Sequence, residues 1–241
     1  PIPEIQFLAY LHNAEDQLRG EAATLPFFSK GQFTNPMVLR VPGLAYQKGF
    51  GGHFHNDNSL TVFRDIPGII LAVPSNGSDA VKMLRTSVKE AYKNGRVIVF
   101  IEPIALYMTK DLHVPKDGGW LFTYPELENE IPVGEFAVYG KSEILTIITY
   151  GNGLYLSLQA KKEIEKKIRK KIKVIDLRWL APINYEGLIE SIEKCKNILI
   201  VDECRKTGCH GEGILAELLS VLNGKSKIEL HAAKDSFIPL G

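Results

Sequence analysis

The sequence predicts an α/β protein with mostly parallel sheets. Short runs of apolar residues alternate along the chain with longer segments in which apolar residues recur every three or four positions. The run at 97–101 is continuously apolar, as expected for a strand buried on both faces of a parallel sheet. Strands and helices that alternate in this way form βαβ units. Two such series, separated by a long irregular stretch, predict two domains.

The first series extends to residue 101. A helix over 14–25 is predicted from apolar residues three or four apart, with Asn13 as its N-cap and Pro26 as its limit. A second helix begins at Ser75-Asn-Gly-Ser78, and Gly95 suits the position just beyond its end. The predicted strands of this series are residues 5–8, 37–41, 69–73 and 97–101.

Between residues 109 and 140, apolar residues follow neither the helical nor the strand period, and several prolines and glycines interrupt the sequence. We expect a linker that wraps the surface and covers the apolar side chains of Trp120, Leu121, Phe122 and Tyr124. In the second series, strands are predicted at 144–149, 174–177, 198–201 and 228–230. The first predicted helix follows a turn at 151–153 and extends to residue 171; the other two lie at 185–195, with Asn184 as the N-cap, and at 214–222. The chain is therefore divided into a first domain (1–115), a linker (116–140) and a second domain (141–241).

Composition and charge exclude several classes of protein. The 241 residues are 45% hydrophobic and 24% charged, with a net charge of +1, so nothing draws the chain to nucleic acid or a membrane. The lysine-rich stretch 161–173 lies over apolar residues at mostly four-residue intervals, which is typical of the solvated face of a helix. Three cysteines, an odd number, argue against a disulfide framework and for a reducing, cytoplasmic location. Because the chain starts at Pro1 within a predicted strand region, we expect a fragment.

The residues best suited to bind a ligand or take part in catalysis lie between Gly43 and Pro74, in the loop that joins two predicted strands. Gly43, Gly49, Gly51 and Gly52 in this loop let the backbone approach a ligand closely. The run His53-Phe-His55-Asn-Asp-Asn58 offers hydrogen-bond donors and acceptors near neutral pH. Open α/β sheets bind ligands in loops at the ends of buried strands. From the residues alone, His55 is as readily a loop hydrogen-bonder as a catalytic group.

Several strings of residues resemble one family, in order, along the whole chain. They are PEIQF, GGHFHNDNS, DIPGIILAVPSN, FIEP-x-x-LY, ITYGNG, VIDLRWLAPI, VDE and DSFIPLG. Together they resemble the beta subunit of thiamine-diphosphate-dependent 2-oxo acid dehydrogenases, the decarboxylating component of pyruvate and branched-chain dehydrogenase complexes. Fused forms with alpha and beta parts in one chain are also similar. The resemblance implies a truncated transketolase-type pyrimidine-binding domain, followed by a three-layer αβα transketolase C-terminal domain with a mostly parallel sheet.

Matched positions imply roles for individual residues. In the family, the residues at Gln6 and Tyr10, with Phe7 between them, line the side of the cofactor's aminopyrimidine ring. His55 matches the histidine of a family HSQ motif, which contacts the substrate near the thiazolium ring, and the resemblance implies that His55 is catalytic. His53 is implied, together with His55, in substrate binding.

The match departs from the family in two places. Asn56-Asp57 replaces the Ser-Gln of the HSQ motif, and the segment that carries the family's activating glutamate does not precede PEIQF in this sequence. Glu4 belongs to the strand motif and is not that glutamate. The diphosphate and Mg²⁺ site of the family belongs to the alpha-type half, so no metal ligand is expected here. We therefore expect this chain to hold half of a site.

The resemblance also implies a reaction and partners. The reaction is oxidative decarboxylation of a 2-oxo acid with acyl transfer to a lipoyl carrier, and it depends on thiamine diphosphate with Mg²⁺. The partners are an alpha-type half, a second copy that binds through the second domain, and a lipoyl acyltransferase, so the isolated fragment is expected to be inactive. One alternative is a transketolase or deoxyxylulose-phosphate synthase, although only Lys48 and Arg64 are basic near the His55 loop. The other is a non-catalytic interaction module.

Four further patterns favour structural interpretations. Cys204 and Cys209-His210 match no common zinc spacing. Gly151-Asn-Gly153 lacks a full phosphate-binding motif and is typical of a tight turn between a strand and a helix. The loop 206–211 opens a helix and could bind an anion, but the resemblance favours a subunit contact. Glu102, at the end of a buried strand, is interpreted as a structural hydrogen-bonding residue.

Overall fold

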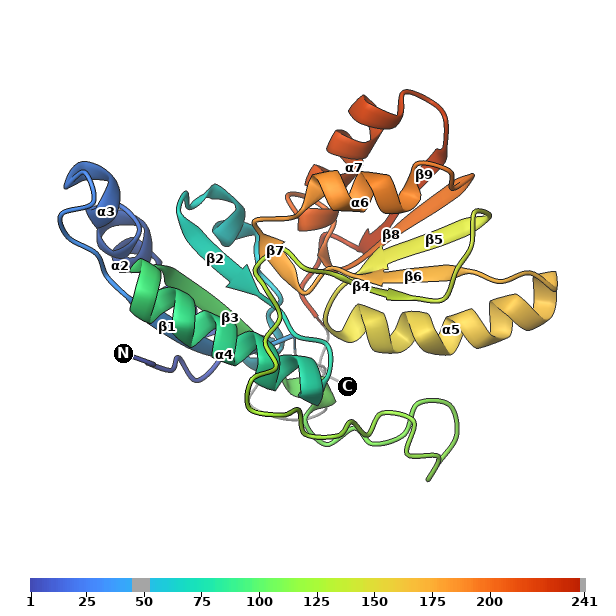
Figure 1. The fold of residues 1–241 in the computed structure, drawn as a ribbon, viewed down its shortest axis with the longest axis horizontal. Coiled ribbons are helices and arrows are strands. Elements are labelled where there is room, and N and C mark those ends of the chain that lie inside the picture. Colours follow the sequence, from blue (N-terminus) through green and yellow to red (C-terminus); the bar gives the residue numbers. More distant parts are fainter. Residues whose placement is uncertain (45–52, 239–241) are drawn as a thin grey trace.

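Two β-sheets form the framework of the chain (Figure 1). A computed structural model describes residues 1–44 and 53–238. The first sheet has the order β1 (Met37–Gly43), β3 (Val97–Pro103), β2 (Ile69–Ala72), β7 (Trp179–Ala181). The second has the order β4 (Ala137–Tyr139), β6 (Lys173–Asp176), β5 (Leu145–Thr149), β8 (Asn197–Arg205), β9 (Lys227–Ala233). Neighbouring strands are parallel except in the pairs β2–β7 and β4–β6, which confirms the predicted fold class.

Helices pack on both faces of the first sheet because its central strands are apolar on both sides. Ile98 of β3 belongs to the same apolar cluster as Met83 of α4 (Gly77–Asn94). Val99, the next residue, belongs to the cluster on the opposite face with α1 (Leu8–Leu11). The predicted start and end of α4 are confirmed, because Gly95 follows the helix with a φ of 64°. The structure identifies the N-cap as Asn76, whose Oδ1 accepts a hydrogen bond from the Asp79 N–H at 2.9 Å.

The strand predicted over residues 5–8 is wrong. Glu4 forms an isolated parallel bridge with Arg40, and α1 begins at Leu8. The carbonyls of Pro1 and Pro3 accept hydrogen bonds from β1 at 3.1 and 2.9 Å. A proline has no N–H to donate in return, so this extended segment cannot complete a strand ladder.

The single helix predicted over 14–25 is also wrong. The segment forms three short pieces: α2 (Glu15–Gln17), the π-helix η1 (Leu18–Ala22) and α3 (Leu25–Phe28). Asn13 caps none of them, and Pro26 lies in the first turn of α3. Glycine is a poor helix former, and Gly20 lies in the middle of η1; proline favours the start of a helix, and Pro26 lies in the first turn of the separate helix α3.

The second sheet lies between two layers of helices, as predicted. In Figure 1, α5 (Asn152–Ile168) covers one face, and α6 (Tyr185–Ile192) and α7 (His210–Leu222) cover the other. Ile147 of β5 shares an apolar cluster with α5, whereas the next residue, Ile148, shares one with α6 and α7. Asn184 caps α6 as predicted, because its Oδ1 accepts from the Gly187 N–H at 3.0 Å. None of the helices in the described residues combines the length and apolarity of a membrane span.

Between η4 (Ile104–Leu106) and β4 the chain forms no helix or strand, in agreement with the irregular stretch predicted there. Trp120 is 5% exposed, and its ring lies 5.1 Å from that of Tyr155 on α5. The chain itself does not supply the expected cover for Leu121, Phe122 and Tyr124, which are exposed. The domain boundaries at 115 and 141 stay a prediction.

One strand from the second series joins the first sheet. The sequence pattern did not predict β7, which pairs antiparallel with β2, and the Val73 N–H donates to the carbonyl of Arg178 at 2.7 Å. The Arg178 guanidinium then forms a buried ion pair with Asp79 of α4, with its Nε and a terminal nitrogen 2.9 and 2.8 Å from Oδ2. Burial raises the pKa of Asp79, but Lys82 and Arg178 outweigh it and hold the pKa below its ordinary value. This ion pair ties the two halves of the chain together.

Asp176 lies beside this ion pair, at the end of β6. It is fully buried, and its Oδ1 accepts a hydrogen bond from Ser75 Oγ, which follows β2, at 2.8 Å. Burial raises the pKa of Asp176 to about 7; the charge of Asp79 adds to this effect, while Ser75 and Arg178 act against it. Asp176 is therefore a second polar contact between the halves, and its protonation is coupled to folding.

We predict that Asp176→Asn removes the part of the free energy of unfolding that wild type loses as the pH rises from about 4 to 7. From about pH 4 to 7 the folded chain binds more protons at Asp176 than the unfolded chain, so the free energy of unfolding falls as the pH rises through this range. The variant should therefore gain stability relative to wild type between pH 5 and pH 8, as measured by urea unfolding. The exposed carboxylate variant Asp65→Asn is the control. A difference between Asp176→Asn and wild type that does not change with pH contradicts the prediction.

Candidate active site

Three of the predicted site residues meet where α1 contacts the His55 loop. Tyr10 Oη lies 3.3 Å from Nε2 of His55. The rings of Phe7 and His55 meet edge to face with their centroids 4.4 Å apart, and the rings of Tyr10 and His55 do so at 5.8 Å. The structure thus brings together two sequence motifs that are separated by some 45 positions.

Local packing fixes the two segments that carry this aromatic cluster of Phe7, Tyr10 and His55. The two leucines of α1 are buried, which turns Phe7 and Tyr10 toward the other side of the helix. His55 belongs to the short 3₁₀ helix η2 (His53–Asn56) and is half-buried. Tyr10 remains 38% exposed, so the cluster is open on one side.

A polar network lies two residues further along each segment and centres on Asp57. His12 Nε2 lies 3.3 Å from Asp57 Oδ2, Ser59 Oγ donates to Oδ1 at 2.8 Å, and a terminal nitrogen of Arg205 lies 3.1 Å from Oδ1. Burial raises the pKa of Asp57, but hydrogen bonds from Ser59, Arg205 and His12 together lower it below its ordinary value. Asp57 is therefore an anion that links α1, its own loop and the end of β8.

The structure places the other predicted residues as follows. Gln6 is exposed next to Phe7. The backbone of His53 belongs to η2, but its side chain lies outside the described part of the structure, as do Gly49, Gly51 and Gly52. The binding and catalytic roles assigned to Gln6, Phe7, Tyr10, His53 and His55 stay predictions.

Sequence reasoning missed His12 and Arg205 as neighbours of the site. One signal was present: Tyr10 and His12 have the same two-residue spacing as His55 and Asp57. No pattern near Arg205 pointed to this loop, because Arg205 reaches it from a strand some 148 positions away.

The cysteines belong to the structural core. Tyr150 Oη donates to Asp202 Oδ1 at 2.6 Å and lies 3.4 Å from Cys204 Sγ. All three cysteines are buried and unpaired. Burial raises the pKa of the Cys209 thiol to about 11 and that of Cys204 well above its ordinary value. Within residues 1–44 and 53–238, no group of three or more His, Cys, Asp or Glu side chains could hold a metal ion.

The glycine-rich turn and the loop before α7 are satisfied by the chain itself. Gly151 has a φ of 54° and joins β5 to α5, as expected for a tight turn. The Gly208 N–H donates to Glu212 at 2.6 Å, and the Gly211 N–H donates to Asp202 at 2.8 Å. These N–H groups therefore need no external anion. Glu102 is structural, as predicted, because it accepts hydrogen bonds from Arg40 at 2.6 Å and Tyr107 at 2.5 Å.

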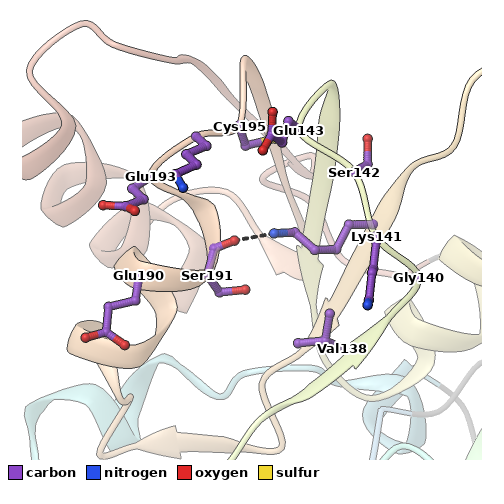
Figure 2. A pocket seen from close by; sticks show the side chains of 11 residues that line it. Val138, Gly140, Lys141, Ser142, Glu143, Glu190, Ser191, Glu193 and Cys195 are labelled. Atoms are coloured by element: carbon purple, nitrogen blue, oxygen red, sulfur yellow. Dashed lines mark hydrogen bonds between the residues drawn. The ribbon is translucent and has the colours of Figure 1, made fainter.

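A polar cleft of about 530 Å³ lies at the amino end of β6 and is the second candidate (Figure 2). Lys173 is 8% exposed there, burial lowers its pKa, and its Nζ donates to the carbonyl of Ser191. The other charged side chains that line the cleft are Lys141, Lys194, Glu143, Glu190 and Glu193. Because both signs of charge are mixed, the cleft favours no class of ligand, and the aromatic cluster is the stronger candidate.

Comparison with known proteins gives a family model for the second half of the chain and relatives along nearly all of it. Residues 134–239 match the family model of the transketolase C-terminal domain. The mitochondrial 2-oxoisovalerate dehydrogenase subunit beta of Dictyostelium discoideum is 31% identical over 96% of this chain and 58% of its own length. The pyruvate dehydrogenase E1 component subunit beta of Staphylococcus epidermidis is 29% identical over 99% of this chain and 69% of its own length. The chain therefore spans 58% and 69% of the length of these two relatives.

One solved structure is described as a split gene transketolase, inactive beta4 tetramer. The match covers 98% of this chain and 68% of the chain in that structure, with a TM-score of 0.69 and 18% sequence identity. At that identity the likeness shows the fold alone. The chain thus has a transketolase-type α/β fold with a transketolase C-terminal domain. Within this class, it is similar along nearly its whole length to the beta subunits of 2-oxo acid dehydrogenases, which confirms the resemblance.

We predict that Cys204 and Cys209 resist alkylation in the folded chain. The thiolate is the reactive form, and burial keeps both thiols protonated near pH 8. Iodoacetamide labelling followed by peptide mass spectrometry should therefore show slow modification in buffer and rapid modification in urea. Equal labelling rates in the two conditions contradict the structural role given to these cysteines.

Proposed function

We propose that this chain is the beta-type portion of a thiamine-diphosphate-dependent 2-oxo acid dehydrogenase. In this proposal the assembled enzyme oxidatively decarboxylates a 2-oxo acid and transfers the acyl group to a lipoyl carrier. The observation that carries the proposal is the contact of Phe7 and Tyr10 with His55, since these residues come from two distant motifs of the resemblance. The similarity to beta subunits supports the class of reaction.

The partners in this proposal are an alpha-type half, a second copy bound through the second domain, and a lipoyl acyltransferase. The chain alone would be inactive, because the diphosphate and Mg²⁺ are assigned to the alpha-type half. A cytoplasmic location is part of the proposal and rests on the three unpaired cysteines.

The aromatic cluster fits one side of an aminopyrimidine ring. Phe7 is half-buried and Tyr10 partly exposed, so two aromatic side chains border the open side of the cluster, where a planar ring could pack. Gln6 is exposed beside them and offers an amide for hydrogen bonding. When bound, thiamine diphosphate would supply the carbanion stabilisation that decarboxylation requires.

His55 would handle a proton at Nε2. An imidazole can accept or donate a proton near neutral pH, and the nearby hydroxyl of Tyr10 orients this nitrogen. The edge-to-face contact with Phe7 holds the ring plane and keeps water from that side of the imidazole. The contacts with Tyr10 and Phe7 support this role, because they hold the ring of His55 in one orientation.

We predict that His55→Gln lowers 2-oxo acid decarboxylation by the assembled enzyme by roughly 10²–10⁴-fold, the usual contribution of a general acid or base. Glutamine can keep a hydrogen bond to Tyr10 but cannot transfer the proton. Decarboxylation is measured as release of labelled CO₂, and His113→Gln, at an exposed position in the irregular stretch between η4 and β4, is the matched control. Unchanged decarboxylation in His55→Gln contradicts the catalytic role of His55.

We predict that magnesium thiamine diphosphate binds the chain only when the alpha-type half is present. Calorimetric titration into the chain alone should give no binding heat, and titration into the assembly should give clear saturation. Binding by the chain alone would show that the diphosphate site is assigned to the wrong half. An assembly that binds no cofactor would contradict the proposed enzyme and favour a non-catalytic interaction module.

A further inference from the structure

We infer that Asp57 is a positioning residue, which holds His55 against Tyr10 by joining the His55 loop to His12 and Arg205. The inference rests on the proposed function only in treating His55 as the group that acts on substrate. The geometry of the network stands without it.

Two contacts hold the loop in one register against α1 and the residue that follows it. Tyr10 contacts His55 and His12 contacts Asp57, both at 3.3 Å and both between residues 45 positions apart. The two contacts therefore run side by side between the same pair of segments. A slide of the loop along the α1 segment would break both, so the His12–Asp57 contact restricts where the His55 ring can lie.

Arg205 gives this pair of segments a third point of attachment. It is the last residue of β8, a strand that pairs with β5 on one side and β9 on the other. A terminal nitrogen of Arg205 lies 3.1 Å from Asp57 Oδ1 and also donates to Ser59 Oγ, which itself donates to Asp57. The loop is thus braced by a strand in the interior of the second sheet.

A carboxylate is required at the centre of this network. Asp57 accepts hydrogen bonds on both oxygens, from Ser59 and Arg205 on Oδ1 and from His12 on Oδ2. The side-chain exposures of Asp57 and Arg205 are 19% and 33%, so solvent screens the pair only in part. An amide at this position would place an N–H₂ group against one of these donors and remove the charge that pairs with Arg205.

The aspartate that stands at the glutamine position of the HSQ motif therefore has a physical role in this chain. In this chain the residue two positions after His55 is an anion, where the motif has a neutral glutamine. Only an anion can form the ion pair with Arg205. Asp57 and Arg205 thus form an ion pair, and this pair sets the orientation of His55.

The test measures the His55 ring directly, in the chain without cofactor. The nearby Phe7 ring should displace the NMR resonance of the His55 Cε1 proton, and the variant Phe7→Leu gives the reference without the contribution of Phe7. In Asp57→Asn the resonance should move toward that reference, because the loop loses its brace. The matched control Asp65→Asn also removes an aspartate–arginine ion pair, but away from this network, and should leave the resonance in place.

Arg205→Gln removes the other side of the ion pair and keeps the test decisive if Asp57→Asn fails to fold. It should move the His55 resonance in the same direction, and Asp57→Glu should restore part of the displacement. In the assembled enzyme, both neutral variants should lower kcat more than they raise KM, because misplacement of an acid–base group affects the transition state most.

The inference is overturned if the His55 resonance stays in place in folded Asp57→Asn and Arg205→Gln. This readout does not depend on catalysis. An assembled wild-type enzyme that decarboxylates no 2-oxo acid would refute the proposed function, and normal decarboxylation by His55→Gln would refute the catalytic role of His55. In either case, His55 resonances that move toward the Phe7→Leu reference in the two network variants would leave the positioning network in place.

Discussion

The buried ion pair between Arg178 and Asp79 is the constraint on which the rest of the structure depends. It joins the strand β7, which comes from the second half of the chain, to the helix that covers the first sheet. A buried ion pair loses much of its attraction to desolvation, and breaking one by removal of a single partner costs about 3–5 kcal/mol. Its main effect here is to fix one arrangement of the two sheets.

The candidate site depends on that arrangement. Its aromatic cluster comes from the first half of the chain, whereas Arg205 comes from the second. The hydrogen bond from Asn152 Nδ2 to the Leu44 carbonyl, at 2.7 Å, crosses the same junction just before the loop that carries His55. If the two sheets shifted relative to each other, Arg205 would leave Asp57. The orientation of His55 is thus set by contacts in both halves.

Most of the fold could be predicted from periodicity, because buried strands and amphipathic helices have distinct patterns. Gly95 and Asn184 also marked helix ends correctly, since capping is a local interaction. The failures have physical causes. The strand predicted over 5–8 fails because the chain leaves its single bridge at Glu4 and enters α1 at Leu8. The strand β7 has three residues, which are too few to show a period, and it pairs with the edge of β2.

The candidate site was predictable to the extent that it followed from the resemblance. Phe7, Tyr10 and His55 were identified by motif and proved to be in contact. His12 and Arg205 were not identified, because their relation to Asp57 exists only after folding brings distant segments together. In a single sequence, a charged side chain that belongs to no motif cannot be distinguished from a solvated surface residue.

The open side of the aromatic cluster has a consequence for regulation in the cell. Tyr10 is partly exposed, and under the proposed function another polypeptide would complete the pocket at this side. Surplus copies of this chain would then consume neither substrate nor cofactor. Output would follow the scarcer of the two subunits, and control over the synthesis of either one would set the flux of the whole complex.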